Sequence, residues 1–267
     1  MCDTCGCNIT PGNQKFAYKP VEKGATAVSV LQGLLKQNDD QAMHNRAHFD
    51  RRGILAVNLM SSPGSGKTAL LEATIARLKN EFKLAVIEGD LETENDAQRI
   101  RAQGVPAHQI VTGTACHLDA HLVHDAFHFM NLDGIDILFI ENVGNLVCPA
   151  SFDLGQHLNV TLLSATEGDD KPSKYPVMFR AADAMLLTKM DLLPYLDDFD
   201  PARAESNLRN LANPAPVIRL SARKGEGLQV WLDWLRAELA AQRKRVAAGQ
   251  SRRPAIQPEG LQLHVAG

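Results

Sequence analysis

The stretch that decides the fold is NLMSSPGSGKTALL, residues 58–71. An apolar run ends here, a loop of small residues follows, and a second apolar-rich segment begins at Lys67. Between a strand and a helix such a loop binds phosphate, because its backbone N–H groups and the positive end of the helix face the anion. The strict pattern has glycine five residues before Gly66, where this chain has Ser61, but Gly64 still lets the backbone approach a phosphate closely.

The residue types in this loop predict their roles. Lys67 is expected to reach the β- and γ-phosphates of a bound nucleotide, and the Thr68 hydroxyl is expected to bind Mg²⁺. The predicted nucleotide-binding residues of the loop are Gly64, Ser65, Gly66, Lys67, Thr68 and Ala69.

Two later segments predict which base the nucleotide carries. In TKMD, which begins at Thr188, the Asp191 carboxylate can accept hydrogen bonds from N1–H and the amino group of guanine, whereas adenine presents an acceptor at N1. This segment resembles the guanine-specificity motif of GTPases, with Lys189 packing over the base and threonine in place of the usual asparagine. The segment VIRLSARKGEG supplies Ser221 and Ala222 as a second base-binding loop, so GTP is expected rather than ATP.

Carboxylates at strand ends are the candidates for holding the magnesium ion. Asp90 closes LAVIEGD and Glu141 closes DILFIEN, and ligands of open α/β sheets lie beyond the carboxyl ends of the strands. Mg²⁺ takes few protein ligands, so Thr68, Asp90 and Glu141 suffice, with Lys67, Asp90 and Glu141 as the predicted catalytic residues. ENVGN resembles a second switch, in which the Gly144 N–H reaches the γ-phosphate. Each carboxylate alone is equally consistent with a helix cap or a solvated loop acid.

The remainder of the chain alternates short apolar runs with helical segments, among them VTLLSAT, AMLLTKM and LQVWLDWLRAELAAQRKR. Short apolar runs bounded by Gly, Asp or Pro are typical of buried strands, and their alternation with helices predicts a doubly wound α/β fold with a mostly parallel sheet. We expect a GTPase domain over residues 51–245, a metal-binding motif, linker and helix over 1–50, and a disordered tail over 246–267.

Cysteine usage points to metal chemistry. The chain has five cysteines, and an odd number fits poorly with a disulfide framework. The first part of the chain is polar and without an apolar leader, so we expect a cytoplasmic protein whose thiols stay reduced. The net charge of −3 predicts no nucleic-acid partner, and without an apolar run of about 20 residues no membrane span is expected.

Three possible metal ligands lie in the central part of the chain. The segment ACHLDAHLVHDAFHFM is expected to begin a helix at Cys116 and His117, and Cys148 follows the proposed second switch. The sheet order of such folds brings these segments close together, so the three side chains could meet beside the γ-phosphate. A lone cysteine in an α/β core is usually a small buried apolar residue, and the sequence leaves both interpretations of the Cys–His pair open.

Four histidines in the same segment recur at spacings of four, three and four residues, which predicts one narrow stripe along a helix. A polar stripe that faces solvent, opposite Leu118, Leu122 and Phe129, is favoured over a path that carries metal along the helix. The four are His117, His121, His124 and His128.

The motifs also resemble a known family. MCDTCGC, SSPGSGKT, GDLET, GTACHLDA, ENVGNLVCPASFDLG and TKMDLLPYL occur in this order in the HypB family of hydrogenase nickel incorporation proteins, and the likeness covers residues 1–7 and about 52–240. The resemblance implies a SIMIBI-class GTPase that forms a GTP-dependent homodimer. It further implies delivery of Ni²⁺, together with a HypA-type nickel chaperone, to the large subunit of [NiFe]-hydrogenase.

The resemblance also implies two metal sites. Family members with the N-terminal CxxCGC motif bind nickel there with high affinity, and a second, weaker site lies in the GTPase domain. Thiolates joined by a freed α-amine suit square-planar Ni²⁺, while a tetrahedral arrangement suits Zn²⁺, and both ions remain expected. The implied ligands are Cys2, Cys5 and Cys7 at the first site and Cys116, His117 and Cys148 at the second.

Two other functions fit many of the same residues. A related GTPase that matures another nickel enzyme, such as urease, would share the nucleotide site, although CxxCGC and CHLDA argue against it. A metal-buffering protein would use its GTPase domain only as the scaffold of a GTP-controlled dimer.

Overall fold

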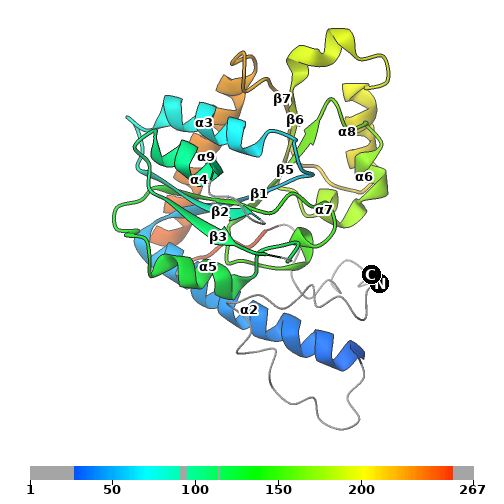
Figure 1. Ribbon diagram of the computed structural model, residues 1–267. Coiled ribbons are helices and arrows are strands. Elements are labelled where there is room, and N and C mark those ends of the chain that lie inside the picture. Colours follow the sequence, from blue (N-terminus) through cyan, green and yellow to red (C-terminus); the bar gives the residue numbers. More distant parts are fainter. Residues whose placement is uncertain (1–26, 91–94, 114, 255–267) are drawn as a thin grey trace.

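A seven-stranded sheet forms the centre of the molecule, which we describe from a computed structural model over residues 27–90, 95–113 and 115–254 (Figure 1). The strand order is β3-β2-β4-β1-β5-β6-β7, and every neighbouring pair is parallel. The predicted doubly wound α/β fold is therefore confirmed. The strands are β1 (Leu55–Met60), β2 (Leu84–Asp90), β3 (Ala107–Val111), β4 (Ile137–Glu141), β5 (Leu158–Ser164), β6 (Ala184–Thr188) and β7 (Val217–Arg219).

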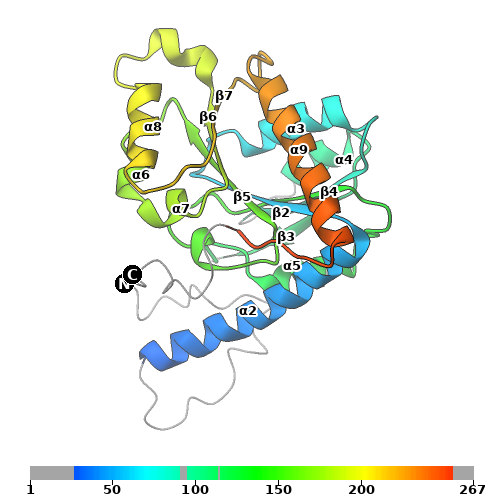
Figure 2. The same ribbon diagram turned by 180° about the vertical axis from the view of Figure 1, so that it is seen from behind.

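Alternate residues of the central strand β1 belong to two separate cores, because successive side chains of a strand point to opposite faces. Leu55 and Val57 pack with α3 and α9 on one face, and Ala56 packs with α2 and α5 on the other. Figures 1 and 2 show these pairs of helices on opposite sides of the sheet. The helices are α2 (Ala27–Arg52), α3 (Lys67–Leu78), α4 (Asn95–Arg101), α5 (Ala120–Phe127), α6 (Lys171–Lys174), α7 (Pro176–Arg180), α8 (Pro201–Arg209) and α9 (Leu228–Ala247), with 3₁₀ turns η1 (Pro149–Ser151) and η2 (Met190–Tyr195).

The order of the strands places the phosphate loop at the centre of the sheet edge. From β1 the chain moves outward to β2 and β3, returns to β4 beside β1, and then continues on the other side through β5, β6 and β7. Ligands of doubly wound sheets bind beyond the carboxyl ends of the strands where this direction reverses. The loop after β1 and the segments after β2, β4 and β6 therefore meet at one edge.

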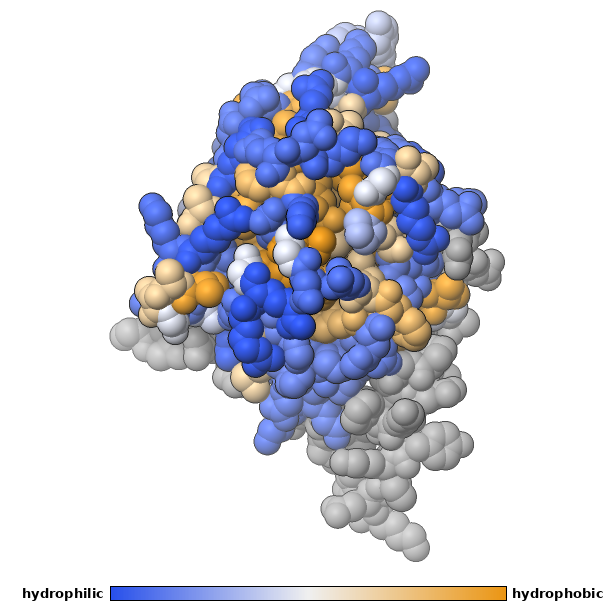
Figure 3. Space-filling model, turned by 90° about the vertical axis from the view of Figure 1, so that its left-hand side faces the viewer, coloured by the Kyte–Doolittle hydropathy of each residue, from blue (hydrophilic) through white to orange (hydrophobic). Residues whose placement is uncertain are grey.

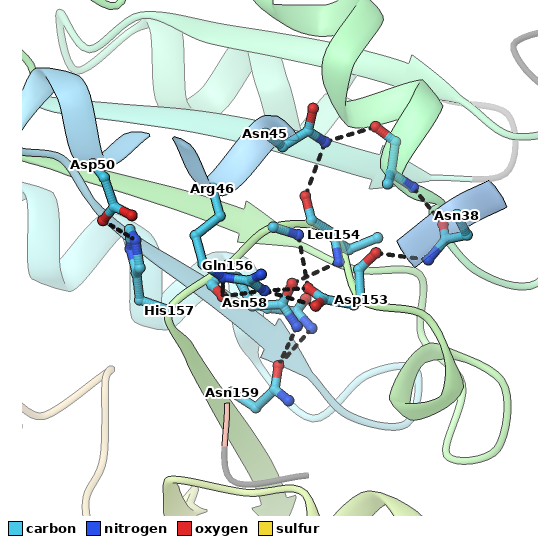
Figure 4. Close-up of polar contacts among 12 residues, drawn as sticks. Asn38, Asn45, Arg46, Asp50, Asn58, Asp153, Leu154, Gln156, His157 and Asn159 are labelled. Atoms are coloured by element: carbon cyan, nitrogen blue, oxygen red, sulfur yellow. Dashed lines mark hydrogen bonds and ion pairs between the residues drawn. The ribbon is translucent and has the colours of Figure 1, made fainter. Parts of the chain in front are cut away.

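Helix α2 continues across the predicted boundary between residues 50 and 51 and packs against α5 and β1. Its Arg46 lies 2.6 Å from the Asp153 carboxylate, and both side chains are buried. The Asn45 amide donates hydrogen bonds to the backbone carbonyls of Ala120 in α5 and Leu154 (Figure 4). Buried polar side chains with partners of this kind fix the helix in one position.

Gly155 makes the close approach of α2 possible. Its φ of +91° lies in the left-handed region, and a Cβ atom there would lie 2.5 Å from Asn45 Cβ and 2.8 Å from the Ala42 carbonyl oxygen. Only glycine fits a backbone that is both left-handed and in contact with a helix. Residues 153–157 therefore form a seat for α2.

The end of α2 is tied to the sheet by a buried histidine. His157 Nδ1 accepts a hydrogen bond from the Ala56 N–H at 3.0 Å, so its Nε2 carries the proton and donates to Asp50 Oδ1 at 3.1 Å (Figure 4). Burial lowers the pKa of His157 in spite of the neighbouring Asp50, which keeps the ring neutral.

Removal of one partner of the Arg46–Asp153 pair should strongly destabilise the protein, because it leaves the other charge buried and uncompensated. Arg46→Met alone is expected to lower the free energy of unfolding by about 3–5 kcal/mol. The measurement is urea denaturation followed by circular dichroism.

The double variant Arg46→Met with Asp153→Leu removes both charges and should lose less stability than Arg46→Met. As a control, Lys174→Ala breaks the exposed pair with Asp170 and should change stability little. A loss for Arg46→Met as small as that of Lys174→Ala would contradict the account of α2 as a buried, charge-paired element.

Candidate nucleotide and metal site

The phosphate loop has the predicted strand–loop–helix context. Strand β1 ends at Met60 and α3 begins at Lys67, while Gly64 and Gly66 have φ values of +74° and +97°. Both values lie in the left-handed region that favours glycine. Ser61, which replaces the glycine of the strict pattern, accepts a hydrogen bond from the Lys67 ammonium at 3.1 Å. The serine thus holds Lys67, the residue predicted to bind phosphate, inside the loop.

The end of β4 brings a buried carboxylate to the start of α3. The Thr68 hydroxyl lies 3.1 Å from Glu141 Oε1, and the Lys67 ammonium lies 3.9 Å from the same oxygen. The structure therefore brings together three of the residues predicted to hold nucleotide and magnesium. Hydroxyl and carboxylate oxygens beside a phosphate loop are ligands that suit Mg²⁺.

The two predicted base-binding segments lie side by side after β6 and β7. The Met190 N–H donates to the Leu220 carbonyl at 3.2 Å, which joins the segment that contains Asp191 to the segment that contains Ser221 and Ala222. Ser221 is buried, and Asp191 is partly exposed at the start of η2.

Thr188, which stands where the usual guanine-specificity motif has asparagine, contacts the phosphate loop. Its hydroxyl donates to the Ser65 carbonyl at 2.7 Å. Lys189 has a left-handed φ of +56°, and its ammonium donates to the Gly64 carbonyl at 2.7 Å. The base segment is therefore tied directly to the phosphate loop, although the motif is not the usual one.

The segment after β4 lies against the phosphate loop at one end. A Cβ atom on Gly144 would lie 2.8 Å from Pro63 Cα, so only glycine leaves room for this approach. Next to it, the Asn145 amide donates to the Cys116 carbonyl at 3.1 Å. The proposed second switch therefore contacts both the phosphate loop and the loop before α5.

The three predicted metal ligands of the domain converge at the other end of this segment. The ligand atoms of Cys116, His117 and Cys148 all lie within 4.8 Å of one another, and the two Sγ atoms are 3.1 Å apart. Neither Cys116 nor Cys148 forms a disulfide bond. The His117 ring stacks on Phe152 with ring centroids 3.9 Å apart, and burial lowers the pKa of His117, which favours the neutral ring that binds metal. Two thiolates and an imidazole suit Zn²⁺ or Ni²⁺.

Comparisons with known proteins identify the family of the chain. The family model described as CobW/HypB/UreG, nucleotide-binding domain, matches residues 55–219. The hydrogenase maturation factor HypB of Azotobacter chroococcum mcd 1 is 51% identical over 244 residues, which cover 90% of this chain and 79% of the relative. The chain belongs to the HypB family.

Two further HypB proteins show the same relationship. HypB of Escherichia coli strain K12, also named a hydrogenase maturation factor, is 54% identical over 208 residues, which cover 78% of this chain and 71% of the relative. The crystal structure of HypB from Helicobacter pylori in complex with nickel has a TM-score of 0.74 at 41% identity, covering 77% of this chain and 96% of that one. The fold and the predicted family are confirmed by these likenesses.

Sequence reasoning missed one carboxylate of the HypB nucleotide site. Asp96, in the first turn of α4, has its Oδ2 3.1 Å from the Thr68 hydroxyl. Asp90 is the last residue of β2, and its backbone carbonyl accepts hydrogen bonds from the N–H and the hydroxyl of Thr112. That its carboxylate binds magnesium stays a prediction. The sequence does show Asp96 as an acid at the start of a short helix just after β2. The prediction considered only acids that end a strand.

The helix that carries the histidines begins later than predicted. Asp119 caps α5, which starts at Ala120, so Cys116 and His117 precede the helix and the prediction of a helix start there was wrong. His117 is therefore not on the helical stripe. The expectation that the stripe faces solvent is also incorrect for His124, which is half-buried and has its Nδ1 3.2 Å from Asn45 Oδ1 in α2.

Three other expectations concern different parts of the chain. Among the helices of residues 27–90, 95–113 and 115–254, none is long and apolar enough to cross a membrane. Helix α9 reaches Ala247, two residues past the predicted end of the domain at 245. The N-terminal ligands Cys2, Cys5 and Cys7, and residues 255–267 of the predicted tail, lie outside the described residues.

A second buried carboxyl lies beside Glu141. Glu88 of β2 and Glu141 of β4 are register partners in neighbouring parallel strands, and their carboxyls share a hydrogen bond. Burial and the Glu141 charge raise the pKa of Glu88 to about 10, so Glu88 is the protonated member at neutral pH. Lys67 and Thr68 face Glu141, which makes it the acceptor of the pair.

The Glu88 proton should make the nucleotide-free protein less stable as the pH rises. The folded-state pKa lies above the usual 4.5, so the favourable contribution of the protonated carboxyl is complete at low pH and is lost toward about pH 10. Glu88→Gln keeps a neutral hydrogen-bond donor, and its free energy of unfolding should depend less on pH between about 5 and 9. One such group contributes at most about 1.4 kcal/mol per pH unit.

Urea unfolding of the wild type and Glu88→Gln at several pH values measures this difference. Glu205→Gln, in a partly exposed pair with Arg209, is the matched control and should follow the wild type. If the free energy of unfolding depends on pH in the same way in the wild type and in Glu88→Gln, Glu88 does not carry the proton.

Proposed function

We propose that this HypB-family chain binds and slowly hydrolyses GTP with Mg²⁺ and uses the nucleotide cycle to deliver Ni²⁺ to the large subunit of [NiFe]-hydrogenase. In this proposal the working form is a GTP-dependent homodimer in the cytoplasm, and a HypA-type chaperone cooperates with it. The names of its relatives as hydrogenase maturation factors, and the nickel complex of the Helicobacter pylori HypB, support the proposal.

One observation carries the proposal. The segment after β4 has Glu141 at its start, in contact with Thr68, and Cys148 seven residues later, with its Sγ 3.1 Å from that of Cys116. Between them, Gly144 lies against the phosphate loop. Nucleotide and metal residues therefore share one short stretch of backbone, which is what a protein needs if GTP is to control the binding of a metal.

Nucleotide binding would use positioning and charge rather than covalent chemistry. In our proposal Lys67 neutralises charge on the β- and γ-phosphates, and Thr68, Glu141, Asp96 and Asp90 supply oxygen ligands around Mg²⁺. The Gly144 N–H would donate to the γ-phosphate. A bound GTP would then pull on the start of the segment that ends at Cys148, and loss of the γ-phosphate would release it.

Base selectivity should rest on Asp191. Asp191→Asn turns one acceptor oxygen into a donor that faces the guanine N–H groups, and a mismatched pair of this kind costs about 1–3 kcal/mol, or roughly 5- to 150-fold in Kd. Xanthosine triphosphate, with a carbonyl at C2, should bind the variant better than the wild type. Fluorescent-nucleotide titration measures both affinities, with Asp197→Asn as a control on a neighbouring exposed acid. Equal GTP affinity in wild type and Asp191→Asn would remove Asp191 from the base site.

Nucleotide and metal should change each other's affinity at the Cys116–His117–Cys148 site. Metal–ligand distances tolerate only about 0.2 Å of change, so a movement of Cys148 against Cys116 alters the affinity. A coupling of about 1–3 kcal/mol is typical, and by linkage it acts equally in both directions. We would titrate Ni²⁺ and Zn²⁺ into the full chain with Cys2, Cys5 and Cys7 replaced by serine, first with GDP and then with a non-hydrolysable GTP analogue.

Two outcomes of this titration contradict the proposal. Equal metal affinities in the two nucleotide states would show that GTP does not control metal binding. A metal affinity unchanged by Cys148→Ser would show that Cys148 is not a ligand.

The cellular test places Lys67→Ala and Cys148→Ser in a strain that lacks the gene, with hydrogenase and urease activities measured. Both variants should fail to restore hydrogenase, whereas full restoration by Lys67→Ala would leave only a metal-buffering role.

A further inference from the structure

A second group of potential metal ligands lies where α2 packs against α5 (Figures 1 and 2). His44 and His48 come from α2, and His124 comes from α5. The ring centroids of His44 and His48 are 4.6 Å apart, and those of His124 lie 5.2 Å from His44 and 6.0 Å from His48. His128, which caps α5, has its ring 5.2 Å from that of His124. The two helices thus bring together imidazoles that are 80 residues apart in the chain.

The two histidines of α2 already face each other as a chelating pair. They are four residues apart on one face of the helix, which is the spacing by which helical histidines share a metal ion. Their Nε2 atoms lie 2.9 Å apart. Two nitrogens at this distance, each about 2.0–2.1 Å from one ion, subtend an angle of about 90°. A right angle suits the square-planar or octahedral geometry of Cu²⁺ and Ni²⁺ better than tetrahedral Zn²⁺.

The third histidine is held in the tautomer that a metal requires. The Asn45 amide nitrogen donates to two backbone carbonyls, of Ala120 and Leu154, so its oxygen must face His124 Nδ1 at 3.2 Å. Nδ1 therefore carries the proton, and Nε2 keeps its lone pair. Metal-binding histidines commonly donate their other ring N–H to an oxygen in this way, which fixes the orientation of the ring.

Burial and the neighbouring charges favour the neutral rings of His48 and His124. Burial, followed by the charges of His44, Arg51 and Arg52, lowers the pKa of His48, and burial with His44 and His128 lowers the pKa of His124. Neutral imidazole is the form that binds metal. The Arg52 guanidinium lies 3.3 Å from His48 Nδ1 on an exposed side chain, so it can turn away when an ion binds.

We propose that His44, His48 and His124 bind a divalent transition metal ion, Ni²⁺ or Cu²⁺, and that this ion fastens α2 to α5. His44 and His48 hold the ion first, because their nitrogens already face each other. His124 stays in the orientation that Asn45 sets, and the exposed His44 side chain turns together with His48 to bring the ion to His124 Nε2. Such a turn is needed because, within the described residues, only Cys116, His117 and Cys148 have three ligand atoms within 4.8 Å of one another.

This all-nitrogen site is separate from the thiolate site. Cys116 and His117 precede α5, whereas His124 lies toward its other end and His128 caps it. His124 lies about 6 Å along α5 from Ala120, and among the described residues the group of ligand atoms within 4.8 Å of one another contains Cys116, His117 and Cys148 without His124, so the two sites do not share one ion. The ligand chemistry also differs, since thiolates prefer softer ions than imidazoles do.

The test uses the full, untagged chain with all five cysteines replaced by serine, so that no thiolate competes for metal. Ni²⁺ is titrated by calorimetry, and Cu²⁺ is bound for electron paramagnetic resonance, in which nitrogen ligands split the signal. His44→Gln, His48→Gln and His124→Gln are compared with His108→Gln, a histidine of β3 that stacks on Phe129 instead. Circular dichroism checks that each variant is folded.

We expect one site whose nickel affinity falls at least about tenfold in His44→Gln, His48→Gln and His124→Gln, because loss of even an outer partner of a metal ligand commonly has an effect of that size. The copper signal should lose one nitrogen coupling in each of the three variants and none in His108→Gln. Equal nickel affinities in all four variants would show that the three histidines do not form a metal site. If His124→Gln changes neither the nickel affinity nor the copper signal, only His44 and His48 of α2 bind the ion, and the proposed link between the helices is wrong.

Discussion

The position of the Glu141 carboxyl is the constraint on which the rest of the site depends. It is buried at the end of β4, faces the Thr68 hydroxyl and the Lys67 ammonium, and lies beside a second buried carboxyl, that of Glu88. Two ionised carboxylates could not share this low-dielectric position with a single ammonium, so one of them keeps its proton. The parallel register of β2 and β4 makes the arrangement unavoidable, because it places the two glutamates on the same face of neighbouring strands. A divalent cation bound at Thr68 would supply the positive charge that this acid-rich edge lacks.

Much of this arrangement was predictable from the sequence, because it is local. The phosphate loop, the strand-terminal Glu141 and the adjacency of the base segments follow from short apolar runs, glycines and the rule that parallel strands end at one edge. The closeness of Cys116 and Cys148 followed from the same rule, and the family resemblance then implied that they bind metal. The contact made by Thr188 was not predictable, because whether a threonine hydroxyl reaches the Ser65 carbonyl depends on distances that residue type does not fix.

The role of α2 was the least predictable part of the fold. Its polar side chains Asn45 and Arg46 gave no apolar stripe in the sequence, since they are buried against carbonyls and a carboxylate supplied by residues more than 70 positions away. Amphipathic periodicity detects burial against apolar surface, and a helix held by polar contacts escapes it. For the same reason the histidines of α5 looked like a solvent-facing stripe, although His124 lies between α5 and a helix that the pattern did not place there.

The connection between β4 and β5 joins these features into one mechanical path. Near its start Gly144 lies against Pro63 and the adjacent Asn145 donates to the Cys116 carbonyl, and near its end Asp153 is paired with Arg46 of α2. If GTP binding moved the phosphate loop, the buried ion pair and the Gly155 contact would hold the other end of the connection against α2. The displacement would then be taken up between the two held points, and Cys148 lies between them. Because residues 153–157 are held against α2, a movement caused by the nucleotide would change the distance between the Cys116 and Cys148 thiols. Without that contact the same movement would spread over the whole connection.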